Sequence, residues 1–247
     1  MILIIGSTHD DVLYFESLAT NRNKSVLFNR YPVTFGKLFN QEVAIVSEIY
    51  TNYISSIVTS YFIDKFFVIL VLSVGTCVGY SSDCEPLTVA ISEKVTLADV
   101  DQLAVRPVSI GQIPNGYPTF FTSDNDAKEI IKKSFETKTT VNYFEGTFFS
   151  SNTFYTREEQ LEPLKSFKKL TPIESHAVFD CTYGGIALAC EMHKVACVAL
   201  KVVESKFGTK VNYQDYSKIL ETFISVGRGV SAALIDIGSN DILEGKV

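Results

Sequence analysis

The stretch FFVILVLSVGTCVG, residues 66–79, is the part of the sequence that decides the fold class. Its first half is a short apolar run rich in branched and aromatic residues, which is typical of a strand covered on both faces in an α/β sheet. Its second half contains Gly75 and Gly79, and glycines at the carboxyl end of such a strand allow a sharp turn or a close approach to a ligand. We therefore expect a central strand that ends in a glycine turn beside the main cleft. A tight strand exit without any ligand explains these glycines equally well.

Composition limits the class of protein. The chain has 247 residues, of which 46% are hydrophobic and 20% charged, and its net charge is -6. This length and composition predict one large domain, residues 1–247, of the α/β class. The acidic balance and the scattered Lys and Arg residues argue against a nucleic-acid partner. The apolar runs are far shorter than the roughly 20 residues that span a bilayer, and the first residues, MILIIG, lack the charged start of a signal peptide. We therefore expect a cytoplasmic protein with no membrane partner.

The cysteines and histidines form no recognisable metal or disulfide pattern. An odd number of cysteines without an export signal indicates reduced thiols, mostly buried as small hydrophobic side chains. No C-x-x-C pair occurs, and no histidines stand at zinc-binding spacing. We expect no metal and no cofactor. The five cysteines are Cys77, Cys84, Cys181, Cys190 and Cys197.

Strand and helix patterns alternate along the chain, which predicts a central mixed sheet. The segment 87–91 is a further expected strand, 97–103 an interrupted one, and the Pro- and Gly-rich segment 106–118 a loop. The other expected strands are 2–5, 32–39, 42–47, 139–149, 178–179 and 196–203. The expected helices are 52–64, 124–135, 158–167, 186–192 and one from 213 to 226 or beyond.

Four motifs occur in a characteristic order. Ile-Ile-Gly at residues 4–6 is followed by acids, Gly-x3-Gly stands at 75–79, Ser-x-x-Phe at 151–154, and a late strand ends in the acid Glu204. In order and spacing these motifs resemble the nucleoside phosphorylase/nucleosidase superfamily, and within it the methylthioadenosine/S-adenosylhomocysteine nucleosidases. The resemblance covers nearly the whole chain. It implies a three-layer α/β/α fold around a partly closed mixed sheet, a homodimer, and no metal.

The resemblance also implies a purine nucleoside as ligand and cleavage of its N-glycosidic bond, through an oxocarbenium-like sugar. Asp11 aligns with the glutamate that orients the attacking water in that family. Phe154 aligns with the phenylalanine that stacks on the purine, and Gly75 and Thr76 are expected to contact the substrate. Both residues also have an explanation without a function: Asp11 as a surface acid at the start of a helix, and Phe154 as a side chain packed in the core. The sequence leaves these alternatives open.

Two charged positions of the family are altered in this chain. The ribose-binding glutamate aligns with Thr182, which accepts a hydrogen bond but cannot supply a charged grip. Asp180, two residues earlier in an extended segment, is the candidate substitute. The aspartate that protonates the leaving purine aligns with Ser205, and Glu204 stands at the neighbouring position. Successive strand side chains point to opposite faces, so Glu204 faces the site only if the strand end bulges by one residue.

Two functions therefore stand side by side. The first is a nucleosidase with weakened catalysis, in which Asp11 orients water and Glu204 is the altered general acid. The second is a catalytically inactive purine-nucleoside-binding or scaffold protein of the same fold. Glu48, with no arginine beside it, would repel a phosphate co-substrate and argues against a phosphorylase. The mean hydropathy of +0.17 is high and favours a homodimer, with 50–61 and 97–118 as the expected contact segments.

Overall fold

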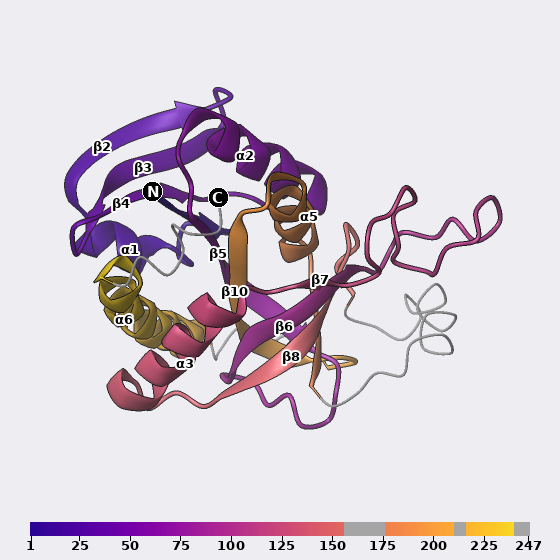
Figure 1. The fold of residues 1–247 in the computed structure, drawn as a ribbon. Helices are drawn as coiled ribbons and strands as arrows, with labels where there is room; N and C mark the ends of the chain where they lie inside the picture. Colours follow the sequence, from indigo (N-terminus) through magenta and orange to yellow (C-terminus); the bar gives the residue numbers. More distant parts are fainter. Residues whose placement is uncertain (156–175, 210–215, 240–247) are drawn as a thin grey trace.

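The computed structural model describes residues 1–155, 176–209 and 216–239, and its centre is a mixed ten-stranded sheet covered by helices on both faces (Figure 1). This arrangement confirms the three-layer α/β/α class. The helix expected over 158–167 lies outside the described residues. One face carries α1 (Leu13–Leu18), α3 (Asn125–Lys138) and α6 (Tyr216–Ser239), and the other carries α2 (Asn52–Lys65) and α5 (Tyr183–His193).

The sheet runs in the order β10-β6-β8-β9-β5-β1-β4-β3-β2, with β7 beside β6. Strand β10 also pairs with β5, so that β5, β9, β8, β6 and β10 close into a ring, as expected for a partly closed sheet. Strands β1, β5 and β10 are parallel neighbours. The strands are β1 (Ile2–Gly6), β2 (Thr20–Leu27), β3 (Tyr31–Leu38), β4 (Gln41–Val46), β5 (Leu70–Gly79), β6 (Val89–Leu97), β7 (Phe121–Thr122), β8 (Tyr143–Ser150), β9 (Ala177–Asp180) and β10 (Ala196–Lys206).

The central strand differs from the expectation at its beginning and at Gly75. It begins at Leu70 rather than Phe66, because α2 runs to Lys65 and Phe66 ends that helix. The strand ends at Gly79, as expected, but the predicted turn is wrong at Gly75, where β5 continues in strand form. The physical reason is that β10 pairs with β5 over its whole length, and these backbone hydrogen bonds hold the chain extended.

The apolar run packs against both helical layers, as its continuous hydrophobicity predicts. Leu70, Leu72 and Val74 pack in a core with α1, α3 and α6. Val71 and Cys77 point the other way, into a core with α2 and α5. Full burial of an aliphatic side chain of this size stabilises the fold by about 1.5–3 kcal/mol. The two cores therefore hold β5 rigidly in the middle of the molecule.

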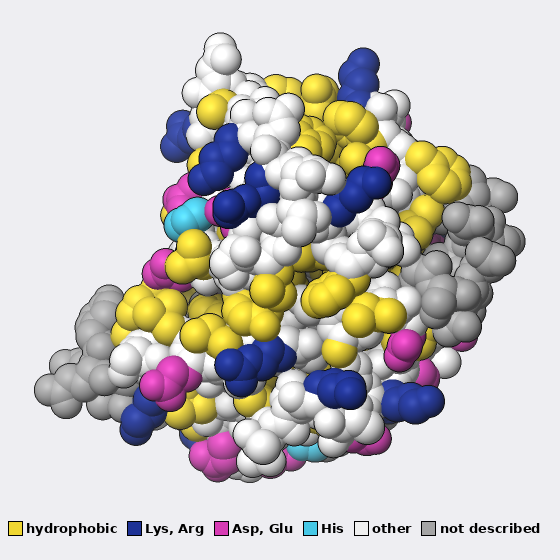
Figure 2. All heavy atoms as spheres, turned by 90° about the vertical axis from the view of Figure 1, so that its left-hand side faces the viewer, with side chains coloured by type: hydrophobic (Ala, Val, Ile, Leu, Met, Phe, Trp, Pro, Cys, Tyr) yellow, Lys and Arg dark blue, Asp and Glu magenta, His cyan; other side chains and the backbone are white. Residues whose placement is uncertain are grey.

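Strand β2 is an edge strand that the sequence patterns did not predict. Its sequence, TNRNKSVL, is polar and exposed except for Leu27, so it carries no alternating apolar signal. Arg22 and Lys24 place positive charges on this open edge, which discourages pairing with another chain. Figure 2 shows such Lys and Arg side chains set among hydrophobic ones on this side of the molecule.

Strand β6 covers 89–97, so it extends the expected strand 87–91 to Leu97, whereas the expected interrupted strand at 97–103 is wrong beyond Leu97. Helix α6 continues past 226 to Ser239, as expected for the last helix. Even so, none of the helices in the described ranges is long and apolar enough to cross a membrane.

Candidate active site

Side chains from separate segments converge around Gly75 in the middle of β5. Gly75 pairs with Lys201 of β10, and the preceding Val74 pairs with the last residue of β1. A Cβ placed on Gly75 would lie 2.9 Å from Asp11 Oδ2, 3.2 Å from Lys201 Nζ and 3.3 Å from Ser7 Oγ. The φ of Gly75 is +141°, which residues with a side chain rarely adopt. Gly75 is therefore needed both for its backbone conformation and for the space in which these groups meet.

Replacing Gly75 tests this crowding. We expect Gly75→Ala to lower the free energy of unfolding by ~1–3 kcal/mol through backbone strain, and in addition to displace the Asp11 carboxylate and weaken ligand binding. Urea unfolding and nucleoside binding measure the two effects. Gly116→Ala is the matched control, because Gly116 also has positive φ (+89°) but no atom within 4 Å of the added Cβ. The prediction is contradicted if Gly75→Ala and Gly116→Ala show the same nucleoside affinity and the same free energy of unfolding.

Asp11 lies in the turn between β1 and α1 and is buried. Its Oδ2 accepts a hydrogen bond of 2.8 Å from the backbone amide of Thr8. Burial raises the pKa of Asp11, and the hydrogen bonds from Thr8 and the charge of Lys201 offset part of this increase. The reading of Asp11 as a surface acid is thus wrong. A buried carboxyl group with a raised pKa is typical of functional sites, although structural residues share this property.

Lys201 is a site residue that the sequence analysis missed. It lies in the middle of β10 with only 1% of its surface exposed. Its Nζ donates to the carbonyl oxygen of Val74 at 3.1 Å and to Thr182 Oγ1 at 3.0 Å, and lies 3.8 Å from Asp180 Oδ2. A lysine in the apolar run ACVALKVV was the available signal, because a fully buried ammonium requires partners.

Asp180 and Thr182 form one hydrogen-bonded unit at the junction of β9 and α5. Asp180 Oδ2 accepts from the Thr182 amide at 3.1 Å, the Thr182 hydroxyl at 3.2 Å and the Tyr183 amide at 2.9 Å. A carboxylate at a helix N-terminus is stabilised by these free amides. Asp180 Oδ1 is buried and has no hydrogen-bond partner among the described residues. The unit therefore offers one free acceptor oxygen.

Glu204 stands on a β-bulge. The β10–β5 ladder shifts register between Val203 and Ser205, so Glu204 is the extra residue of the bulge. Its carboxyl group interacts with the Thr76 side chain, on the same stretch of β5 as Gly75. Burial, and then the nearby Asp11 charge, raise the pKa of Glu204, while the hydrogen bond with Thr76 lowers it. The bulge is the irregularity that the sequence analysis required for Glu204 to reach the site.

The remaining predicted residues, Phe154 and Ser205, follow β8 and lie in β10, respectively. Phe154 follows β8, where the amide of Ser151 donates to the Asp180 carbonyl at 3.0 Å. Its side chain is 42% exposed, so the core-packing alternative for Phe154 is wrong. The buried ring is that of Tyr155, which packs against Phe179. Ser205 is buried and pairs with Val78 beyond the bulge.

Residues 2–235 match the family model of the phosphorylase superfamily, and the chain therefore belongs to this family. A 5'-methylthioadenosine/S-adenosylhomocysteine nucleosidase from Colwellia psychrerythraea is 24% identical, over 99% of this chain and 97% of the relative.

Two solved structures share the fold. A nucleosidase of that name from Neisseria meningitidis, in complex with methylthio-immucillin-A, has a TM-score of 0.84 at 19% identity and covers 95% of this chain and 98% of its own. A nucleosidase from Colwellia psychrerythraea, in complex with adenine, has a TM-score of 0.79 at 23% identity. The match covers 100% of this chain and 96% of that structure's chain.

Proposed function

We propose that the protein hydrolyses the N-glycosidic bond of an adenine nucleoside such as methylthioadenosine or S-adenosylhomocysteine. The observation that carries this proposal is a pair of neighbouring carboxyl groups: Asp11 is buried and lies beside Gly75, and Glu204 is partly buried, with the Asp11 charge among the groups that raise its pKa. Two carboxyl groups in different environments are the usual means of glycosidic hydrolysis. The names of the relatives, and their complexes with adenine and a methylthio inhibitor, point to the same substrate class.

The environments divide the roles of the two acids. Burial raises the pKa of Asp11, but Lys201 lies beside it and its charge opposes this increase, so that the ionised form, which orients and deprotonates water, has a cation as its partner. Glu204 has the Asp11 charge beside it, and no cation is among the groups that shift its pKa within the described part of the chain. Glu204 therefore favours the protonated form and donates its proton to the leaving adenine.

The other residues hold the substrate. The free Oδ1 of Asp180 and the hydroxyl of Thr182 accept hydrogen bonds from the ribose hydroxyls. The exposed ring of Phe154 stacks on the purine, an arrangement that contributes ~1–3 kcal/mol per base in nucleic-acid complexes. These residues need no metal or cofactor for hydrolysis.

Water, rather than phosphate, is the nucleophile. Glu48 accepts a hydrogen bond of 3.2 Å from the His9 amide and another from the Tyr50 hydroxyl. The Asp11 charge also contributes to the raised pKa of Tyr50, which shows that Tyr50, and with it the Glu48 carboxylate, lies close to Asp11. Two neighbouring negative charges repel a phosphate anion.

One observation favours the second candidate, a purine-nucleoside-binding protein without catalysis. The hydroxyl of Thr182 already donates to Asp180 and accepts from Lys201, so it grips the ribose less firmly than a free carboxylate. A weaker grip lowers the binding energy available to the transition state. We therefore expect turnover below that of typical family members.

A nucleoside panel distinguishes the two functions. The protein is incubated with methylthioadenosine, S-adenosylhomocysteine, adenosine and inosine, with and without phosphate, while free base is measured. Binding is measured in parallel by calorimetry. Phosphate-independent release of adenine supports the enzyme, and binding without release supports the second candidate. If the protein neither releases base nor binds a nucleoside, both candidate functions are overturned.

We propose further that the single domain, residues 1–247, works in the cytoplasm as a homodimer. Helix α2 exposes 69% of Tyr53 and 54% of Ile57, which are one turn apart on the same face and adjoin the exposed Tyr50. We expect sedimentation velocity at micromolar concentration to show a dimer, and Ile57→Glu to shift it to monomer. Ile235→Glu, at an exposed position of α6, is the control. A monomeric unmodified protein would contradict this prediction.

A further inference from the structure

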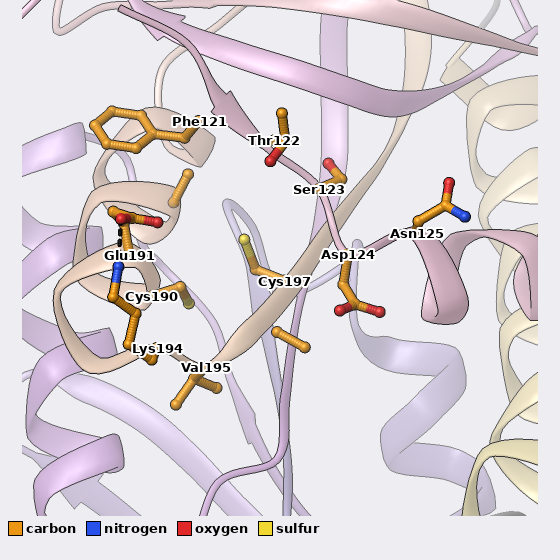
Figure 3. A pocket seen from close by; sticks show the side chains of 12 residues that line it. Phe121, Thr122, Ser123, Asp124, Asn125, Cys190, Glu191, Lys194, Val195 and Cys197 are labelled. Carbon is orange, nitrogen blue, oxygen red and sulfur yellow. Dashed lines mark hydrogen bonds and ion pairs between the residues drawn. The ribbon is translucent and has the colours of Figure 1, made fainter. Parts of the chain in front are cut away.

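A pocket lies at the end of β10 that is opposite to Glu204. Its volume is about 270 Å³, and it opens between the N-terminus of α3 and the C-terminus of α5 (Figure 3). Cys190 of α5 and Cys197 of β10 both line it, together with the Glu191–Lys194 ion pair. Cys197 and Glu204 are seven positions apart along the strand, which corresponds to roughly 20 Å. The pocket is therefore separate from the candidate active site.

The turn between α5 and β10 brings the two cysteines together. Lys194 ends α5 in the left-handed conformation (φ 58°), and the amide of Val195 donates to the Cys190 carbonyl at 3.0 Å. The chain then reverses, so that Cys190 and Cys197 line the same pocket and the side chain of Cys190 interacts with that of Cys197. The Tyr183 hydroxyl lies 3.6 Å from the same sulfur.

These contacts single out Cys197 among the five thiols. The hydrogen bond from Cys190 lowers the pKa of Cys197 against the opposing effect of burial, and Tyr183 adds to the lowering. The pKa is raised for each of the other four, which are Cys77, Cys84, Cys181 and Cys190. Because the thiolate is the reactive form, Cys197 is the thiol best prepared to attack an electrophile.

We propose that Cys190 and Cys197 form an oxidation site, at which a small hydroperoxide that enters the pocket converts the two thiols into an intramolecular disulfide. The pocket is several times the roughly 30 Å³ that a water molecule occupies in the liquid, so hydrogen peroxide fits beside the sulfurs. Cys197 acts as the attacking thiol and Cys190 as the resolving thiol.

The reaction balances in two steps. The Cys197 sulfur attacks one peroxide oxygen: an S–O bond forms, the O–O bond breaks, and the leaving hydroxide takes the thiol proton as water. The Cys190 sulfur then attacks the Cys197 sulfur: an S–S bond forms, the S–O bond breaks, and the hydroxyl leaves with the second thiol proton as water. The two thiols lose two electrons and the peroxide gains them.

Peptide mapping tests this proposal. The protein is treated with hydrogen peroxide, quenched with catalase, denatured in an alkylating reagent and digested with trypsin without reduction. Cleavage after Lys194 separates the cysteines, so the disulfide joins residues 170–194 to residues 195–201, with a mass about 2 Da below the sum of the reduced peptides. This product should appear before Cys84 or Cys181 is modified, and reduction should remove it.

Variants assign the bond. Residues 170–194 also contain Cys181, so Cys181→Ser must retain the cross-link and Cys190→Ser must abolish it. In Cys190→Ser the sulfenic acid of Cys197 remains and should be trapped by dimedone. A cross-link that persists in Cys190→Ser, or its absence at peroxide concentrations that already oxidise Cys181, would overturn the proposal. The map of the unmodified protein decides the matter even if a variant fails to fold, and none of these readouts depends on nucleosidase activity.

Discussion

The Asp11→Asn variant is expected to release adenine from methylthioadenosine ~10²- to 10⁴-fold more slowly than the unmodified protein. The amide has nearly the shape of the carboxylate and keeps an acceptor for the Thr8 amide, which donates at 2.8 Å. It cannot, however, take a proton from water. Nucleoside binding through Phe154 should remain, so the loss should appear in kcat rather than in the dissociation constant. Base release under saturating substrate, with calorimetry in parallel, measures both.

Asp10→Asn is the matched control for this change. Asp10 is the adjacent acid, but its carboxylate accepts a hydrogen bond of 2.6 Å from the Tyr216 hydroxyl rather than facing Gly75. We expect this variant to retain its rate within a few-fold. If Asp11→Asn turns over as fast as Asp10→Asn, then Asp11 is not the group that activates water.

The Glu204→Gln variant is expected to lose activity by a similar ~10²- to 10⁴-fold and to change the pH profile. In the proposed role of general acid, Glu204 acts only when protonated, so we expect activity below its raised pKa and a loss of activity as the pH rises through it. Asp11 works only when ionised, so activity appears as the pH rises through the pKa of Asp11. The profile of kcat/KM should therefore be bell-shaped in the unmodified protein. Glu204→Gln should lose the alkaline limb and keep the acid limb.

The same substitution should change stability in a pH-dependent way. Because burial raises the pKa of Glu204, the stability that its protonated form confers is present at low pH and lost as the pH rises through the folded-state pKa. Glutamine is neutral throughout, so Glu204→Gln should raise the Tm at pH 8 relative to the unmodified protein, with little gain at pH 4. Glu93→Gln, at an exposed position of β6, should show no such trend. A Tm difference that is equal at both pH values would argue against a raised pKa of Glu204.

Much of the fold could be predicted from local patterns. The continuous apolar run at 66–79 predicted a strand covered on both faces, and β5 is covered by two helical layers. The failures have physical causes. Strand β2 is polar because it lies at the sheet edge, and the expected turn at Gly75 is overridden by the ladder with β10.

The candidate site was only partly visible in the sequence. Motif order pointed to Asp11, Gly75 and Phe154, because each follows or lies within a recognisable strand. Lys201 was missed because a single lysine in an apolar strand shows no partner until the strands are paired. Only the fold places its ammonium group within reach of Thr182 and next to Asp11.

By itself, the sequence determined the α/β class, the buried central strand and the choice of acids that could do the chemistry, since these depend on hydrophobic periodicity and on residue type. The tertiary structure decided which of those acids meet. Whether Glu204 faces the site depends on a register shift between β10 and β5, and a shift of one residue reverses the direction of a side chain. The pKa of Asp11 likewise depends on burial and on the charge of Lys201, which the distant β10 brings to it. Such properties arise from pairing between distant segments, and no local pattern of residues contains them.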